Sequence, residues 1–422
     1  MHSMDKRKIP AVKANILWDR FLRTRQLTAE LTKGLCAEDQ MIQSMPDASP
    51  TKWHLAHTNW FFEAFILKPR GICVQPDDQY DFLFNSYYNS LGPQFSRARR
   101  HLISRPNLRE VWDYRKAVEE ALERCWDELD EEALSLFEVG VNHEQQHQEL
   151  IVTDIKHAFS QNPLAPVITD PKTQHGTFSA PLEWCNFAEG NYLVGTQGGF
   201  HFDNEAPQHT VHLQEFRLAN RPVTNAEYLA FIADKGYQRP NLWLSEGWAW
   251  VQQLKAEAPL YWRKQQGEWA AYTLSGTRLL NVHEPVCHLS YYEANAFATW
   301  AGKRLPTEYE WEVAANTLPV DGNFLDVDQL HPSPSKPSSL TLLQMFGDVW
   351  EWTQSAYQAY PGFRAEDRAI GEYNGKFMVN QWVLRGGSCA TPTGHIRPSY
   401  RNFFPVSANW QFSGVRLADE CN

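Results

Sequence analysis

The first part of the chain repeats apolar side chains at intervals of three and four residues, the spacing of helices with one buried face. This pattern predicts helices over four stretches, residues 11–35, 49–67, 108–129 and 131–159. Ser49, Pro50 and Thr51 precede the second stretch and form a suitable start for a helix. Four long amphipathic helices in succession favour a four-helix bundle.

An irregular segment, residues 69–107, separates the second and third predicted helices. It is rich in Asp, Tyr, Asn, Gly and Arg. A loop of this length inside a compact bundle is usually functional or disordered. Its many aromatic side chains argue against disorder, because such side chains favour burial.

The pattern changes after residues 161–176, a proline-bearing polar stretch that reads as a linker. Beyond it, short apolar runs alternate with Gly, Asn and Pro turns, and helical patterns return at 225–236 and 291–304. We therefore predict an α+β protein with two domains, a helical bundle over residues 1–165 and an irregular α+β domain over residues 177–422.

Composition narrows the possible functions. The chain has 422 residues, of which 43% are hydrophobic and 21% charged, as in globular proteins. Its net charge of −11 argues against nucleic-acid binding, and no apolar run is long enough to span a membrane. The basic start lacks the apolar core of a secretory signal, and the 7 cysteines form no C-x-x-C pair. These features predict a cytoplasmic location without nucleic-acid or membrane partners.

Candidate chemistry is concentrated in VNHEQQHQELIVTDI, residues 141–155. His143, Glu144 and His147 form H-E-x-x-H, in which Glu144 would be the base of a zinc hydrolase. The same residues form H-x-x-x-H-x-E with Glu149, in which the histidines would bind a different metal. Both readings place His143 and His147 on one helix face, because residues four apart are neighbours there.

Two histidines leave a metal site incomplete, and WHLAHTNWFF at residues 53–62 offers the missing ligand. Its histidines, His54 and His57, lie on the second predicted helix, and bundles build metal sites from facing helices. His57 is the better candidate. A site of three histidines with open positions fits iron or zinc.

Several motifs of the second half resemble those of formylglycine-generating-enzyme-type domains, a variant of the C-type lectin fold. They occur in the expected order at residues 216–232, 289–315, 347–353, 384–389 and 412–418. We expect most residues of the motifs GDVWEWT and RGGS to have a structural role. The copper-binding cysteine pair of formylglycine-generating enzymes is not expected, because only Cys389 and Cys421 lie near the C-terminus.

The first half resembles DinB-type helical bundles that carry H-x-x-x-H-x-E. The two halves together resemble the ergothioneine-biosynthesis sulfoxide synthases. That family consists of non-haem iron enzymes that use O2 to couple a thiol to C2 of the imidazole of hercynine. The resemblance implies an Fe(II) cofactor bound by His57, His143 and His147.

The same resemblance implies the residues that bind hercynine. Gln146 would hold the substrate imidazole, since an amide can donate to or accept from a ring nitrogen. Asn409 and Trp410 would contact the carboxylate and the trimethylammonium group, and an aromatic face suits a quaternary ammonium.

Residues 84–106 resemble the loop of the family's cysteine-using branch, which implies that Tyr87 or Tyr88 donates a proton during C–S bond formation. Arg97 and Arg416 would bind the carboxylate of the thiol donor, cysteine or gamma-glutamylcysteine, and Phe412 would line that pocket. A buried structural ion pair is an equally good reading of Arg416.

The chain departs from that branch in QFSRARRH, residues 94–101, where Gln94, Phe95 and Ser96 replace the usual Arg-His-Pro at the start of the loop that binds the thiol donor. An altered donor pocket fits the related selenoneine synthases, which join a selenosugar to hercynine. We expect an iron- and O2-dependent enzyme that forms a C–S bond and a sulfoxide. A C–Se bond from a selenosugar is the first alternative, a zinc hydrolase the second, and a non-catalytic binding module the third.

Overall fold

A computed structural model describes residues 11–169, 178–325, 329–336, 341–365 and 369–420. Its contacts divide the chain into two compact units. The first contains residues 1–161 together with Asp367–Tyr373, of which residues 369–373 are described and are called the return segment below. The second contains Asn162–Glu366 and Asn374–Asn422. Residues 170–176 of the predicted linker lie outside the described residues.

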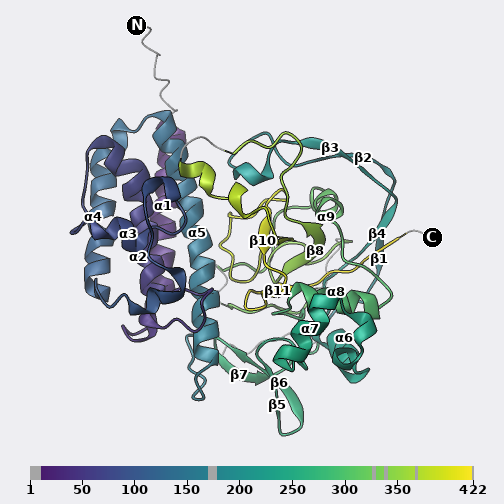
Figure 1. Cartoon of the computed structure of the whole chain (residues 1–422). Coiled ribbons are helices and arrows are strands. Elements are labelled where there is room, and N and C mark those ends of the chain that lie inside the picture. The colour runs from purple at the N-terminus through teal and green to yellow at the C-terminus, as the bar shows by residue number, and fades with distance from the viewer. Residues whose placement is uncertain (1–10, 170–177, 326–328, 337–340, 366–368, 421–422) are drawn as a thin grey trace. The chain divides into compact units, whose positions relative to one another are not determined.

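Within its described residues, the first unit contains the predicted bundle of four long helices (Figure 1). Their bounds are α1 (Ala11–Thr32), α2 (Thr51–Phe62), α4 (Leu108–Cys125) and α5 (Glu131–Ser160). Helix α2 packs against both α4 and α5, and α5 also packs against α1. The aromatic side chains of Phe21, Phe61, Phe62 and Phe137 are fully buried. The apolar periodicity therefore predicted these helices correctly.

Polar side chains fix where the long helices begin. Asn107 and Glu110 form a capping box at the start of α4, and Asp130 accepts a hydrogen bond from the Ala133 amide at the start of α5. Each cap satisfies an amide that the first helical turn leaves unpaired.

The long segment between α2 and α4 is folded into short helical pieces: Glu63–Leu67, Lys68–Arg70, α3 (Gln79–Phe84), Asn89–Leu91 and Arg97–Leu102. Lys52 of α2 anchors its far end, because its Nζ donates to the carbonyls of Ile103 and Pro106, each at 2.8 Å. Burial lowers the pKa of Lys52 to about 8.

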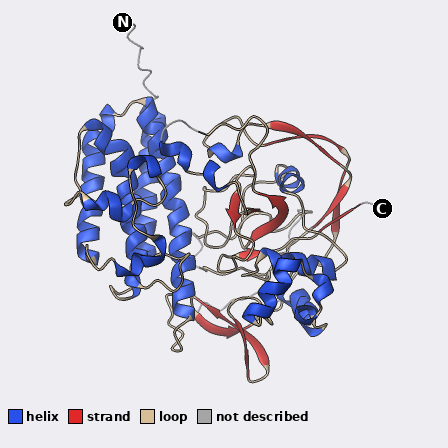
Figure 2. Ribbon diagram, viewed as in Figure 1, coloured by secondary structure: helices blue, strands red, loops and turns tan. Residues whose placement is uncertain are grey.

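The second unit combines short helices with short strands (Figure 2). Its α-helices are α6 (Asn225–Ala233), α7 (Ser245–Leu254), α8 (Tyr291–Trp300) and α9 (Glu308–Ala315). Helices α6 and α8 confirm the two predicted helical patterns. Helix α9 was missed, because its three glutamates alternate with aromatic and apolar residues, a period of two that is not typical of a helix.

Within the described residues, the strands form four small sheets. Their orders are β1-β4-β12, β10-β9-β8-β11, β2-β3 and β5-β6-β7. The strands are β1 (Trp184–Phe187), β2 (Gly190–Val194), β3 (His209–Leu213), β4 (Phe216–Ala219), β5 (Trp262–Gln265), β6 (Glu268–Thr273), β7 (Gly276–Leu279), β8 (Trp350–Ala356), β9 (Trp382–Arg385), β10 (Asn402–Phe404), β11 (Ser413–Gly414) and β12 (Ala418–Glu420). Neighbouring strands are antiparallel except β8 and β11.

Motif GDVWEWT supplies strand β8, whose Trp350 and Trp352 are buried. Motif RGGS follows with Gly386 at φ +99°, where a Cβ would lie 2.6 Å from the Met345 carbonyl oxygen. Both motifs therefore have a structural role in the second unit.

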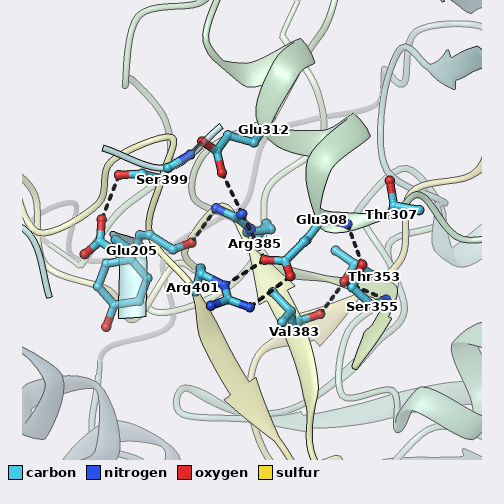
Figure 3. A network of polar contacts seen from close by, with 12 residues as sticks. Glu205, Thr307, Glu308, Glu312, Thr353, Ser355, Val383, Arg385, Ser399 and Arg401 are labelled. Atoms are coloured by element: carbon cyan, nitrogen blue, oxygen red, sulfur yellow. Dashed lines mark hydrogen bonds and ion pairs between the residues drawn. The ribbon is translucent and has the colours of Figure 1, made fainter. Parts of the chain in front are cut away.

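A buried network of charges joins helix α9 to strand β9 and the chain near β10 (Figure 3). Arg401 donates from Nε and Nη2 to the two oxygens of Glu308, at 2.8 and 2.9 Å. Arg385 donates to Glu308 at 3.1 Å and to Glu312 at 2.7 Å. Burial raises the pKa of Glu308, but the charges of Arg401 and Arg385 outweigh this effect and hold the pKa below its usual value.

The described residues include no helix with the length and apolar character needed to cross a bilayer.

Replacing Glu308 with Gln should lower the free energy of unfolding by about 3–5 kcal/mol, because buried Arg401 loses its carboxylate partner and Arg385 keeps only Glu312. Glu308→Gln should also be less sensitive to acid than the unaltered chain. The stabilisation from a carboxylate with a lowered pKa is complete above pH 4.5, its unfolded value, and is lost as the pH falls below it. Urea denaturation followed by circular dichroism measures both effects. The same change at exposed Glu268 should cost less than about 0.5 kcal/mol; equal losses at the two positions would refute the role of the network.

Candidate metal centre

Three histidines converge in the core of the bundle. His143 and His147 lie one turn apart on α5, and His57 faces them from α2. Nε2 of His57 is 3.1 Å from Nε2 of His143, and one ligand atom from each histidine lies within 4.8 Å of the other two. All three side chains are buried. Of the metal-ligating groups on described residues, this is the set that converges, and Glu149 is not part of it.

Hydrogen bonds determine which ring nitrogens point into the site. Nδ1 of His57 donates to the carbonyl of Phe84 at 2.5 Å, so its Nε2 carries a lone pair that faces His143. Nδ1 of His147 lies 2.8 Å from Nδ1 of His54, which leaves Nε2 of His147 for a ligand. Metal-binding histidines typically use one nitrogen for the ion and the other for such an outer partner.

The electrostatic state of the histidines also suits a metal. Burial lowers the pKa of His57 and of His147 well below the usual value, and lowers the pKa of His143 to about 3. All three imidazoles are therefore neutral near pH 7, which is the form that binds metal ions. A set of three neutral nitrogen donors fits Fe(II) or Zn(II).

Glu144, the candidate base of a zinc hydrolase, has a different role. Its carboxylate accepts hydrogen bonds from Arg25 at 2.9 Å, Arg115 at 2.6 Å and Thr28 at 2.7 Å. Desolvation raises the pKa of Glu144, but the charges of Arg115 and Arg25 outweigh this effect and lower the pKa to about 2. The carboxylate ties α5 to α1 and α4, and these contacts correct the hydrolase reading of H-E-x-x-H.

Three tyrosines surround one side of the histidine cluster. The ring of Tyr373 lies 5.8 Å from that of His143, and the ring of Tyr87 lies 6.0 Å from that of Tyr373. Tyr88 is fully buried against Tyr87 and Phe65. Burial raises the pKa of both Tyr87 and Tyr88, so these phenols keep their protons at neutral pH.

Tyr373 belongs to the return segment and was not found by sequence reasoning. Its hydroxyl donates to Oε1 of Gln146, the residue expected to hold a substrate imidazole. Neighbouring Glu372 accepts hydrogen bonds from the amides of Asn89 and Ser90, at 3.0 and 2.9 Å, which secures the return segment on the chain that follows Tyr87 and Tyr88. A lone tyrosine 227 residues away from Gln146 gives no periodic or spacing signal that could have revealed this contact.

The two arginines expected to bind a donor carboxylate have other partners. Arg97 is exposed, and its Nη2 donates to the carbonyl of Asp47. Arg416 is fully buried, and it makes hydrogen bonds of 2.7 to 3.0 Å to both oxygens of Glu351. It also donates to the carbonyls of Ala219 and Leu343, at 2.9 Å each. These contacts favour the structural ion pair as the role of Arg416.

The remaining candidates lie in the second unit. Asn409 and Trp410 are partly buried, and the indole ring of Trp410 lies 6.1 Å from Phe404. Phe412 is fully buried, with its ring 4.9 Å from that of His288. Each therefore lies near the C-terminal strands of its own unit.

Comparison with known protein families identifies the type of domain to which the second unit belongs. Residues 180–421 match the sulfatase-modifying factor enzyme 1-like domain. The chain is also 32% identical to a hercynine oxygenase from Mycolicibacterium thermoresistibile, over 88% of each protein. A hercynine oxygenase from Mycolicibacterium smegmatis is 32% identical, over 89% of this chain and 92% of that protein. Ergothioneine biosynthesis protein 1 of Schizosaccharomyces pombe is 30% identical, over 52% of this chain and 27% of that protein.

The chain belongs to the hercynine oxygenase family. This membership and the matched domain confirm the resemblance and the α+β fold class expected from the motifs.

Replacing Glu144 with Gln should lower the free energy of unfolding by about 3–5 kcal/mol, because Arg25 and Arg115 would remain charged and buried. Metal affinity, measured by competition with a chromogenic chelator, should stay unchanged below the new unfolding temperature. The control is Glu120→Gln, at an exposed position of α4 that pairs with Lys116. The zinc hydrolase alternative would instead be supported if the unaltered chain has a zinc-dependent hydrolytic activity that Glu144→Gln loses while its stability and metal binding stay unchanged.

Proposed function

We propose that the chain is an iron(II)- and O2-dependent enzyme that joins a thiol to C2 of the imidazole of hercynine and yields a sulfoxide. The observation that carries this proposal is the buried set of His57, His143 and His147 in a chain that aligns with hercynine oxygenases over most of its length. Iron(II) bound by these imidazoles would supply the redox chemistry that activates O2.

Gln146 would orient the substrate imidazole next to the metal ligands. It precedes His147 directly on α5, so a ring bound to its amide would lie beside the site. The hydroxyl of Tyr373 holds Oε1 of Gln146 and thereby fixes the rotation of the amide. A fixed amide limits the substrate ring to one orientation, which favours reaction at one carbon.

Tyr373 is also the best candidate for the proton donor. Its ring lies 5.8 Å from that of His143, whereas the Tyr87 ring packs on Tyr373 and the Tyr88 ring packs on Tyr87 and Phe65. Burial raises the pKa of Tyr87 and of Tyr88, so both phenols stay protonated at neutral pH and are weaker acids than an exposed tyrosine. We therefore extend the expected acid pair to a cluster of three phenols.

A selenosugar donor is the second candidate, and the arginines favour it. Binding an amino-acid thiol would require a cation for its carboxylate, but Arg416 is occupied by Glu351 and Arg97 lies exposed against Asp47. A sugar carries no carboxylate and needs no such cation. The family's donor loop also has an altered sequence here, residues 94–101.

The function is tested by loading the chain with Fe(II) without oxygen and then measuring O2 uptake with hercynine and a donor. Uptake should require hercynine together with a donor. Mass spectrometry with cysteine, gamma-glutamylcysteine and a selenosugar in competition identifies the bond formed. Products with a C–S bond support the first candidate, and products with a C–Se bond support the second. Absence of hercynine-dependent uptake with every donor would refute both.

Replacing Tyr373 with Phe should lower the rate of product formation by about 100-fold, the order of magnitude lost with a general acid. The ring and its contact with His143 would remain, so metal affinity should stay unchanged. Tyr114→Phe is the control, because Tyr114 donates to Glu63 elsewhere in the bundle. A larger loss in Tyr87→Phe or Tyr88→Phe than in Tyr373→Phe would assign the acid to that residue instead.

A further inference from the structure

His54 is the histidine of the H-x-x-H pair on α2 that does not join the converging set. It is buried, and its two nitrogens lie between two residues of α5. Nδ1 lies 2.8 Å from Nδ1 of His147, and Nε2 lies 3.1 Å from Oδ2 of Asp154. His54 thus links a candidate metal ligand to a buried carboxylate 7 residues further along the same helix.

The positions of the protons in this chain follow from the metal site. If Nε2 of His147 binds an ion, its Nδ1 must carry the proton of the neutral ring and donate it to His54. Nδ1 of His54 then accepts, so the proton of His54 lies on Nε2 and is donated to Asp154. Oδ2 of Asp154 accepts this hydrogen bond. One arrangement of protons therefore satisfies all four contacting atoms.

Asp154 is held in place from a second direction. Its Oδ2 also accepts a hydrogen bond from the Ser49 amide at 2.7 Å, just before α2 begins. The carboxylate is buried. A fixed carboxylate gives the His54 ring a fixed direction, and the ring in turn fixes the rotation of His147.

We propose that His54 and Asp154 are positioning residues that hold His147 in the tautomer and orientation required for metal binding. This inference rests on the metal centre of the proposed function, but not on its substrates. Outer partners of this kind typically change metal affinity 10- to 100-fold. A purely structural role, in which Asp154 only anchors the start of α2 through Ser49, would leave metal affinity unchanged in folded variants.

Two substitutions of His54 separate these roles. The side-chain oxygen of Asn occupies about the position of Nδ1 in histidine, so His54→Asn keeps an acceptor for His147 and loses the link to Asp154. The side-chain nitrogen of Gln occupies about the position of Nε2, so His54→Gln keeps the link to Asp154 and loses the acceptor. His54→Gln and His54→Ala should weaken metal binding about 10- to 100-fold, and His54→Asn should lose less.

The measurement is the dissociation constant for Co(II) and Zn(II) on the full chain, by chelator competition, with thermal denaturation to confirm folding. The matched control is Thr153→Val, which removes a buried hydroxyl beside Asp154 that donates to the Leu150 carbonyl. This control should bind metal as the unaltered chain does. Nitrogen-15 spectra of the Zn(II)-loaded chain should show protons on Nδ1 of His147 and on Nε2 of His54.

The outcomes are distinct. An unaltered chain that binds neither ion would refute the metal centre and, with it, the proposed function. An unaltered chain that binds metal while folded His54→Gln binds equally well would refute only the positioning role. Equal losses in His54→Asn and His54→Gln, or a proton on Nδ1 of His54, would also overturn it.

Discussion

A buried imidazole has two nitrogens, and each needs a partner, because leaving a polar atom unpaired away from water costs free energy. This constraint organises the core of the bundle. His57 uses one nitrogen on the Phe84 carbonyl, and His147 uses one on His54. The nitrogens that remain point at one another across the space between α2 and α5. Nε2 of His57 and Nε2 of His143 therefore lie 3.1 Å apart, an arrangement that a bound cation would satisfy.

Helix α5 carries two of the candidate metal ligands and also a buried carboxylate, Glu144, that stabilises the bundle. Successive residues of an α-helix point about 100° apart, so Glu144 faces away from its neighbour His143. The carboxylate reaches Arg25 and Arg115, whose other carboxylate partner is the half-exposed Glu119. The histidines and the glutamate of H-E-x-x-H therefore have separate roles in this chain. The histidines direct candidate metal-binding nitrogens toward α2, and the glutamate holds α5 against α1 and α4.

The sequence predicted those features that repeat or lie close together in the chain. Apolar spacing located the four bundle helices, and the i, i+4 rule brought His143 and His147 to one face. The contribution of Tyr373 could not be predicted, because it depends on a return segment more than 200 residues away from α5 whose position is set by contacts of Glu372 with backbone amides. Arg416 shows the opposite limit. Its residue type suits both a carboxylate ligand and a buried ion pair, and only the position of Glu351 distinguishes them.

The tyrosines and arginines together bear on what the enzyme accepts. The phenols of Tyr87, Tyr88 and Tyr373 bring protons, but no fixed positive charge, to the side of the metal site that they line. Burying a donor's carboxylate there would require a cation to offset its desolvation. Arg100 is the buried guanidinium of the donor loop, yet it stacks 3.3 Å from the centre of the Trp53 ring and donates to Ser49. A donor without a carboxylate would place no such demand on the site, which is the physical basis of the selenosugar alternative.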